Sequence, residues 1–128
     1  MRIVTYLSPE ELIEIQAELI DRFGGTHGIR DRGLLESACY RPQSGYYPTI
    51  LLQAAALLQS LAMSHVFVDG NKRIAWVATK TFLAINRIRV IVQADAAEDF
   101  LLNRVIVAHC EIDEIAGWLD LKATQTTR

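Results

Sequence analysis

The chain has 128 residues, of which 51% are hydrophobic and 22% are charged. This balance excludes an intrinsically disordered chain, and the length predicts one domain spanning residues 1–128. Lys and Arg number 13 and Asp and Glu number 15, which gives a formal net charge of −2. Because direct nucleic-acid binding normally requires a basic field, we expect no direct nucleic-acid partner.

The cysteines and the apolar segments indicate the cellular setting. Cys39 and Cys110 lack a CxxC partner, so we interpret them as small core residues in a reducing compartment. No secretion signal is recognisable at the N-terminus. The most apolar stretch, residues 50–63, is too short for a membrane span and is interrupted by Gln53. We therefore expect a cytoplasmic protein without a membrane segment.

Helix signals are clear in the first third of the chain. Ser8 followed by Glu11 forms a capping box, which predicts a helix that runs to Phe23 and ends at a pair of glycines. Asp31 is a suitable N-cap for a second, short helix that ends before Pro42.

The rest of the chain continues in the same pattern, with apolar residues at helical spacing. Further helices are predicted over residues 50–63, 71–86 and 95–108 and around residues 115–119. Residues 88–92 are rich in β-branched side chains, but one extended run forms no sheet alone. The polar tail over residues 124–128 is predicted to be frayed and disordered. The sequence therefore predicts an all-α fold of about six helices.

The nonapeptide over residues 65–73, HVFVDGNKR, concentrates polar and charged side chains between two predicted helices. Gly70 allows an unusual backbone conformation and a close approach to a ligand. The helix that starts near Asn71 directs unpaired N–H groups and its positive dipole end at the turn. Lys72 and Arg73 add two cations, so the arrangement is typical of an anion-binding site.

The same segment carries groups suited to catalysis. His65 has a side chain in the pKa range of a general base. Asp69 is a candidate ligand for a divalent cation, and Asn71 is a candidate to orient a phosphate oxygen. Together these groups suit phosphoryl or nucleotidyl transfer. A purely structural interpretation, with a common Gly-Asn turn and a solvated Lys-Arg pair, accounts for the spacing equally well.

The residues themselves resemble a known family. HVFVDGNKR is similar to the Fic/Doc signature HxFx[D/E]GN[G/K]R, and Lys at its eighth position is the Doc-type (death-on-curing) form. Residues 6–12 and 27–38 also resemble the opening helices of that family, and residues 41–43 resemble its next loop. The resemblance implies a compact helical bundle with the active-site loop between two central helices.

The resemblance implies a role for each motif residue. His65 would deprotonate the target hydroxyl, and Phe67 would be buried and pin the loop. Asp69 would hold Mg²⁺ or help to orient His65. Gly70 and Asn71 would form the nest that binds the phosphates of ATP.

Lys72 is the informative departure from the commoner Fic pattern, and Arg73 would contact phosphates. Adenylyl-transferring members have Gly at the position of Lys72, and the Lys form goes with an inverted nucleotide. The resemblance therefore implies a serine/threonine protein kinase toxin that transfers the γ-phosphoryl group of ATP to elongation factor Tu and arrests translation. Trp76 replaces an Arg that is frequent in adenylylating members, and Val66 replaces the usual Pro. Adenylyl transfer is the alternative activity.

The chain contains no recognisable inhibitory [S/T]xxxE[G/N] segment. The resemblance therefore implies a separate cognate antitoxin whose disordered segment folds onto the toxin. A catalytically silent antitoxin-binding module is a further alternative.

Residues 41–48 correspond in sequence position to the flap that Fic proteins use to align a substrate. Tyr46 and Tyr47 are candidates to line this flap, although loop aromatics with no function fit equally well. His27 and His109 lack metal-ligand spacing and are interpreted as structural or surface residues.

Overall fold

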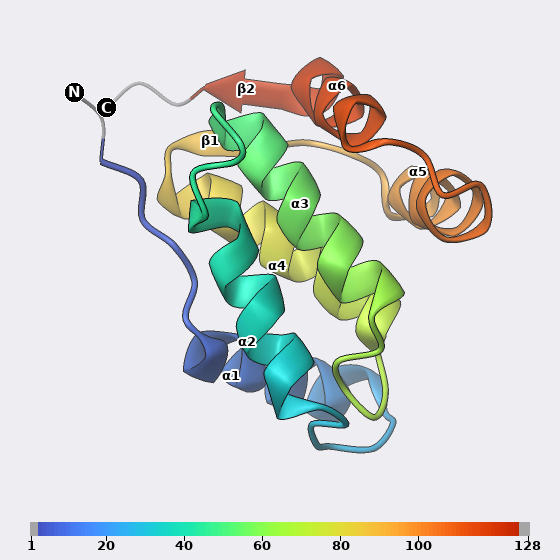
Figure 1. The fold of residues 1–128 in the computed structure, drawn as a ribbon. Coiled ribbons are helices and arrows are strands. Elements are labelled where there is room, and N and C mark those ends of the chain that lie inside the picture. The colour runs from blue at the N-terminus through green and yellow to red at the C-terminus, as the bar shows by residue number, and fades with distance from the viewer. Residues whose placement is uncertain (1–2, 126–128) are drawn as a thin grey trace.

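The computed structural model describes residues 3–125. The elements in chain order are α1 (Pro9–Phe23), α2 (Arg32–Tyr40), a 3-10 turn η1 (Arg41–Gln43), α3 (Ile50–Met63), α4 (Asn71–Ile85), β1 (Ile88–Val90), α5 (Ala94–Asp99), a π-helical segment η2 (Phe100–Val107), α6 (Ile112–Lys122) and β2 (Ala123–Gln125). Figure 1 shows α3 and α4 alongside each other in the middle of the molecule, with α1 and α2 on one side and α5 and α6 on the other. The predicted helical fold, with the nonapeptide between two central helices, is confirmed.

The local signals at the first two helices act as the sequence predicts. The Ser8 hydroxyl accepts a hydrogen bond from the Glu11 N–H at 3.1 Å, and the Glu11 carboxylate accepts one from the Ser8 N–H at 2.8 Å. This capping box satisfies two backbone donors at the start of α1. Gly24, with φ of 92°, ends α1, and Asp31 caps α2 by accepting from the Leu34 N–H at 3.0 Å.

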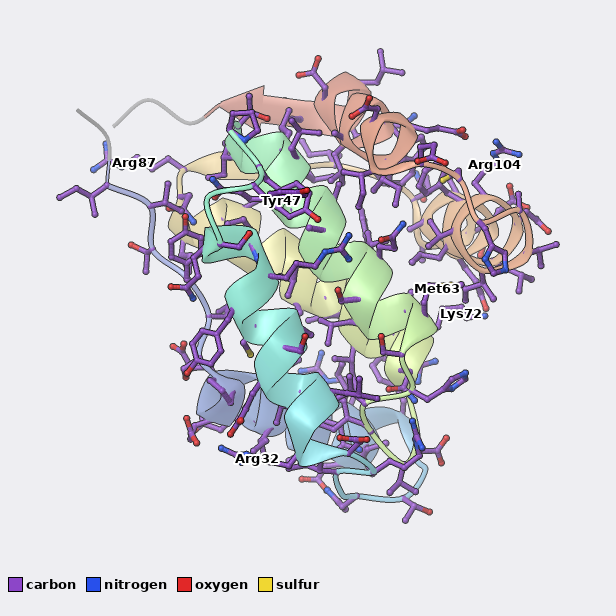
Figure 2. The ribbon with its side chains drawn as sticks, viewed as in Figure 1. Arg32, Tyr47, Met63, Lys72, Arg87 and Arg104 are labelled. Atoms are coloured by element: carbon purple, nitrogen blue, oxygen red, sulfur yellow. The ribbon has the colours of Figure 1, made fainter. Side chains whose placement is uncertain are left out.

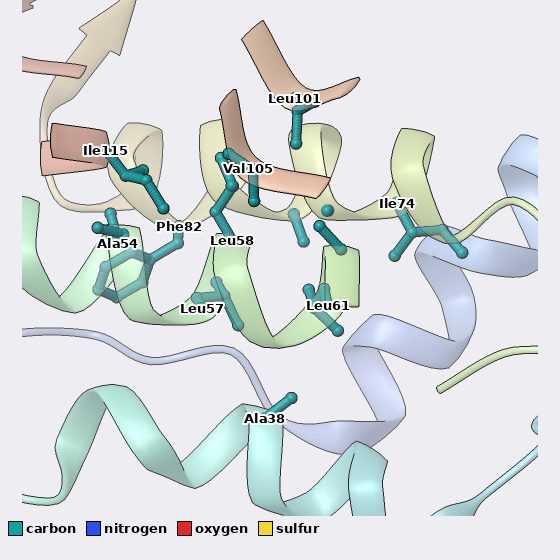
Figure 3. Packing of buried hydrophobic residues seen from close by; sticks show 14 of the residues in the cluster. Ala38, Ala54, Leu57, Leu58, Leu61, Ile74, Phe82, Leu101, Val105 and Ile115 are labelled. Atoms are coloured by element: carbon teal, nitrogen blue, oxygen red, sulfur yellow. The ribbon is translucent and has the colours of Figure 1, made fainter. Parts of the chain in front are cut away.

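Helix α3 is buried along most of its length, which explains why its sequence lacks a polar face. Leu58 of α3, Phe82 of α4 and Ile115 of α6 belong to one buried cluster (Figure 3). Within residues 3–125, no helix has the length and hydropathy needed to cross a bilayer. Because α3 is held on several sides, its C-terminal end presents the motif loop from a rigid base.

The prediction that residues 88–92 form no sheet was wrong, as was the expectation that Thr124 and Gln125 are frayed. Strands β1 and β2 pair antiparallel, with Ile88 opposite Gln125 and Arg89 opposite Thr124. The β-branched run therefore finds a partner strand far along the chain, which no local pattern reveals. The remainder of the predicted tail, residues 126–128, lies outside the described residues.

The helix predicted over residues 95–108 begins as an α-helix and continues with π-helical geometry. Helix α5 ends at Asp99 and continues as η2, where the Ala108 N–H donates to the Asn103 carbonyl at 3.1 Å. Phe100, the first residue of η2, is buried in the core, and its ring stacks on Trp118 with centroids 4.1 Å apart. Stacking of this kind contributes about 0.5–1.5 kcal/mol beyond burial of the rings.

Cys39 and Cys110 are buried free thiols in the core, as predicted. Burial raises the pKa of the Cys39 thiol from 9.0 to about 12. At pH values between 9.0 and about 12, the Cys39 thiol is deprotonated in the unfolded chain but still protonated in the folded chain. Cys39 therefore contributes stability below pH 9 that is lost as the pH rises further.

We predict that the free energy of unfolding falls more steeply for the wild type than for Cys39→Ala between about pH 8 and about pH 10.5. Urea unfolding of both proteins at the two pH values measures this difference, and the other titrating groups are common to both. Equal losses in the two proteins would contradict a raised pKa for Cys39.

Candidate active site

The motif loop, residues 65–70, joins the C-terminal end of α3 to the N-terminal end of α4. Val66 and Phe67 are buried, whereas His65, Val68 and Asp69 are exposed. The loop is thus anchored at its middle by apolar side chains, and its polar side chains face outwards. The burial of Phe67 agrees with its expected position.

The side chain of Asn71 closes the motif loop. Its Oδ1 accepts a hydrogen bond from the Phe67 N–H, and its Nδ2 donates to the Phe67 carbonyl, both at 2.9 Å. One amide therefore satisfies both backbone groups of a buried residue. The Asn71 amide faces Phe67, which leaves the backbone N–H of Asn71 for any contact with a ligand.

A second stretch of chain, residues 26–31, runs antiparallel to the motif loop and is named the supporting segment here. Ile29 forms a β-bridge with Phe67. The Val66 carbonyl accepts from the N–H groups of Arg30 and Asp31 at 2.8 and 3.1 Å. Backbone pairing therefore fixes the loop from outside the motif.

The Arg30 side chain holds the backbone beside the candidate base. Its Nε donates to the His65 carbonyl at 2.6 Å, and its Nη2 donates to the Ser64 carbonyl at 3.1 Å. His65 has a φ of 51°, in the left-handed region that costs a non-glycine residue free energy. Such strain persists where neighbouring contacts fix the backbone, and it is frequent at functional sites.

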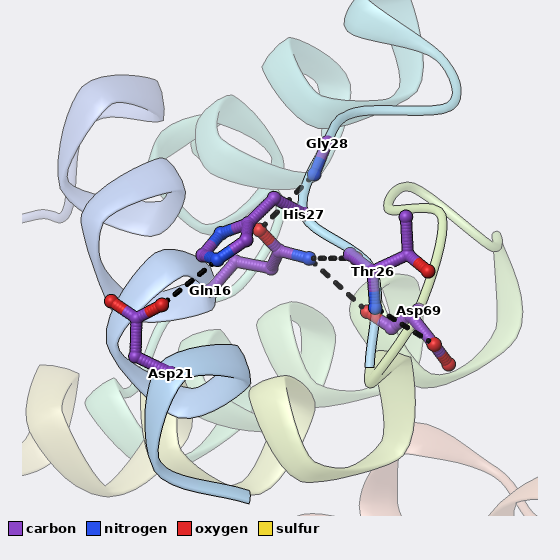
Figure 4. Close-up of polar contacts among 6 residues, drawn as sticks. All are labelled: Gln16, Asp21, Thr26, His27, Gly28 and Asp69. Carbon is purple, nitrogen blue, oxygen red and sulfur yellow. Dashed lines mark hydrogen bonds and ion pairs between the residues drawn. The ribbon is translucent and has the colours of Figure 1, made fainter. Parts of the chain in front are cut away.

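Gln16 of α1 ties the supporting segment to the motif loop (Figure 4). It is only 2% exposed, and its Nε2 donates to the carbonyls of Thr26 and Asp69 at 3.2 and 3.5 Å. Its Oε1 accepts from the Gly28 N–H at 3.5 Å. In the same view His27 pairs with Asp21 at 2.9 Å on the surface.

The Asp69 carboxylate is held by two backbone donors. Its Oδ2 accepts from the Thr26 N–H at 3.1 Å, and its Oδ1 accepts from the Gly70 N–H at 3.2 Å. Gly25 lies so close that a Cβ at that position would be 2.9 Å from Oδ2, and its φ of 118° also requires glycine. Because a carboxylate has about four acceptor sites, Asp69 retains capacity to bind a cation.

The N-terminal end of α4 is open to a ligand. Gly70, with φ of 76°, precedes the helix, and no side chain among the described residues caps it. The first N–H groups of α4 therefore lack intrahelical partners, and they form the positive end of the helix dipole. Lys72 and Arg73 add positive charge there, which opposes the dipole and favours a bound anion.

A cavity of about 870 Å³ lies beside this helix end. Its lining includes residues 70–73 together with parts of α1, α5 and η2, and its volume lies within the range of small-molecule sites. Lys72 Nζ lies 3.1 Å from Glu98 Oε2 of α5. The Arg73 guanidinium carbon lies 4.3 Å from the centroid of the Phe23 ring.

The sequence that builds this site, from α1 to α4, matches a known family. The Fic/DOC family profile matches residues 6–83, so the chain belongs to the Fic/DOC family. The chain is 48% identical over 104 residues to "Toxin Doc" of Mycolicibacterium smegmatis, covering 76% of this chain and 79% of that protein. It is 32% identical over 97 residues to "Protein kinase doc" of Escherichia phage P1, covering 73% of this chain and 77% of that protein. Within the family, the chain is therefore of the Doc type, as its motif indicates.

The structure does not place residues 41–48 beside the motif, so their assignment as the flap was wrong. They precede α3, whereas the motif follows it, and the 14 residues of α3 place its two ends roughly 20 Å apart. Of this loop, the Arg41 side chain reaches back along α3 to Ser60. Figure 2 labels Tyr47 at one end of α3 and Met63 at the other. Arg41 ties this loop to α3 by donating to the Tyr47 hydroxyl at 2.8 Å and to the Ser60 hydroxyl at 2.9 Å. The segment that borders the motif is instead the supporting segment.

Several residues outside the nonapeptide support the site, and no pattern in the sequence identified them in advance. Gln16, Thr26 and Arg30 hold the loop, and Phe23 and Glu98 contact its two cations. The one available signal was Gln16 itself, because a glutamine on the buried face of an amphipathic helix requires a hydrogen-bond partner nearby. The other contacts depend on tertiary pairing.

We predict that Asn71→Ala destabilises the protein by about 1–3 kcal/mol, because the buried Phe67 N–H and carbonyl lose their partners. Hydrogen exchange followed by NMR should show loss of protection at the Phe67 amide. Asn103→Ala is the matched control, since the Asn103 amide is exposed and donates to the exposed Asp99 carboxylate, and its loss should cost below about 0.5 kcal/mol. Unchanged protection at Phe67 would contradict the role given to Asn71.

Proposed function

We propose that the protein is a Doc-like toxin, a protein kinase that transfers the γ-phosphoryl group of ATP to a Ser or Thr hydroxyl of a translation factor and so arrests translation. The observation that carries the proposal is Lys72, whose side chain lines the cavity at the N-terminus of α4. The relative named "Protein kinase doc" supports the kinase activity. Elongation factor Tu is the target by resemblance, and the site of action is the cytoplasm.

The helix end supplies the phosphate-binding groups. The N–H groups at the start of α4 and the side chains of Lys72 and Arg73 would bind the phosphate oxygens of ATP. Lys72 would exchange its ion pair with Glu98 for a phosphate. Because phosphoryl transfer depends mainly on positioning and charge neutralisation, these groups would supply much of the catalysis.

His65 is the proposed general base. Its imidazole would accept the proton of the target hydroxyl while the hydroxyl oxygen forms a bond to the γ-phosphorus. The bond from the γ-phosphorus to the bridging oxygen breaks, and ADP leaves with that oxygen. The contacts of Arg30 with the His65 and Ser64 carbonyls support this role, because they hold the backbone that carries the imidazole.

Asp69 is the proposed ligand for Mg²⁺. Its two N–H donors leave acceptor sites free on the carboxylate oxygens, which fits a hard cation. Bound Mg²⁺ would neutralise charge on the phosphate oxygens. Asp69 would then act as the protein's anchor for the nucleotide's metal ion.

We propose a cognate antitoxin as the regulatory partner. The name "Toxin Doc" of the relative from Mycolicibacterium smegmatis supports this proposal. The antitoxin would contribute a disordered segment that orders on binding and supplies the inhibition that the chain's own sequence lacks.

The test uses ATP labelled on either the α- or the γ-phosphate, with Mg²⁺ and elongation factor Tu. We expect transfer of the γ label alone, reduced at least about 100-fold by His65→Ala. His109→Ala is the matched control, because His109 is also exposed and has a similar φ of 54°. Transfer of the α label would establish adenylyl transfer instead, and no transfer of either label would favour a silent binding module.

A further inference from the structure

Phe23 is an exposed aromatic residue with no place in the core. It is the last residue of α1, it is 56% exposed, and it is absent from the buried cluster that the described residues form. Burial of the ring therefore does not account for a phenylalanine here. Its ring lies beside the cavity, against the guanidinium of Arg73.

The contact with Arg73 has the geometry of a cation–π interaction. The guanidinium carbon is 4.3 Å from the ring centroid, well within the range of about 6 Å for this interaction. Arginine also stacks on aromatic faces by virtue of its planar guanidinium. The contact restricts a long side chain that otherwise has many rotamers.

The two cations of the motif are held in different ways. Lys72 pairs with the carboxylate of Glu98, which offsets its charge until a phosphate replaces the carboxylate. Phe23 carries no charge, so it holds Arg73 while the positive charge stays available. Arg73 is therefore preorganised for an anion, whereas Lys72 must first exchange partners.

The position of Phe23 is fixed by the end of α1. The Gly24 N–H donates to the Ile20 carbonyl at 2.7 Å, which closes the last turn of the helix. A Cβ on Gly70 would lie 3.6 Å from Ile20 Cδ1, so this turn packs directly against the start of α4. The ring thus approaches Arg73 from a fixed base.

We propose that Phe23 is a positioning residue that orients Arg73 towards the phosphates of the bound nucleotide. The inference rests on the proposed function, since it assigns Arg73 to the nucleotide. An exposed cation–π contact corresponds to a change of about two- to fivefold in affinity. The effect should pass entirely through Arg73.

The test is isothermal titration of Mg²⁺–ATP into the full chain carrying Phe23→Leu, Phe23→Trp, Arg73→Ala or the double change. We expect about two- to fivefold weaker binding for Phe23→Leu and near wild-type binding for Phe23→Trp. In the Arg73→Ala background, Phe23→Leu should have no further effect on affinity, because Phe23 acts through Arg73. The four proteins form a double-mutant cycle that measures this coupling.

Tyr40→Leu is the matched control, since Tyr40 is 55% exposed and lies at the far end of α2. Circular dichroism verifies that each variant is folded. Wild-type affinity in Phe23→Leu, or an equal loss with and without Arg73, would overturn the role of Phe23 alone. A wild type that binds no ATP would overturn the proposed function together with this inference.

Discussion

The hydrogen bonds between the Asn71 amide and the Phe67 backbone hold the loop on which the site depends. Phe67 is buried, so its N–H and carbonyl require partners, and Asn71 supplies both from the first turn of α4. This closure fixes the start of α4 relative to the loop. The exposed side chains of His65 and Asp69 therefore project from a loop whose middle belongs to the core.

The electrostatics of the site follow from the same arrangement. The open N-terminal end of α4 already carries a partial positive charge, and Lys72 and Arg73 increase it at a cost in local stability. Two neighbouring elements reduce that cost, with Glu98 pairing with Lys72 and Phe23 lying against Arg73. A bound polyanion would offset it more completely, which links the stability of the helix end to occupancy of the site.

The parts of the fold that depend on residues close together in the sequence could be predicted. The capping box at Ser8, the cap at Asp31 and the apolar run of α3 are local signals, and the nonapeptide identified the loop itself. Pairing of β1 with β2 and of Ile29 with Phe67 joins segments distant in sequence, so no local pattern revealed it. The placement of residues 41–48 failed for the same reason, because position along the chain does not give position around α3.

Phosphate binding at the start of α4, beside the motif loop, is tested most directly by titrating the ¹⁵N-labelled protein with Mg²⁺–ATP and following the amides by NMR. We expect the largest shift changes on the amides of Gly70, Asn71, Lys72 and Arg73. Saturable changes confined to other parts of the chain, with these four amides unmoved, would contradict it.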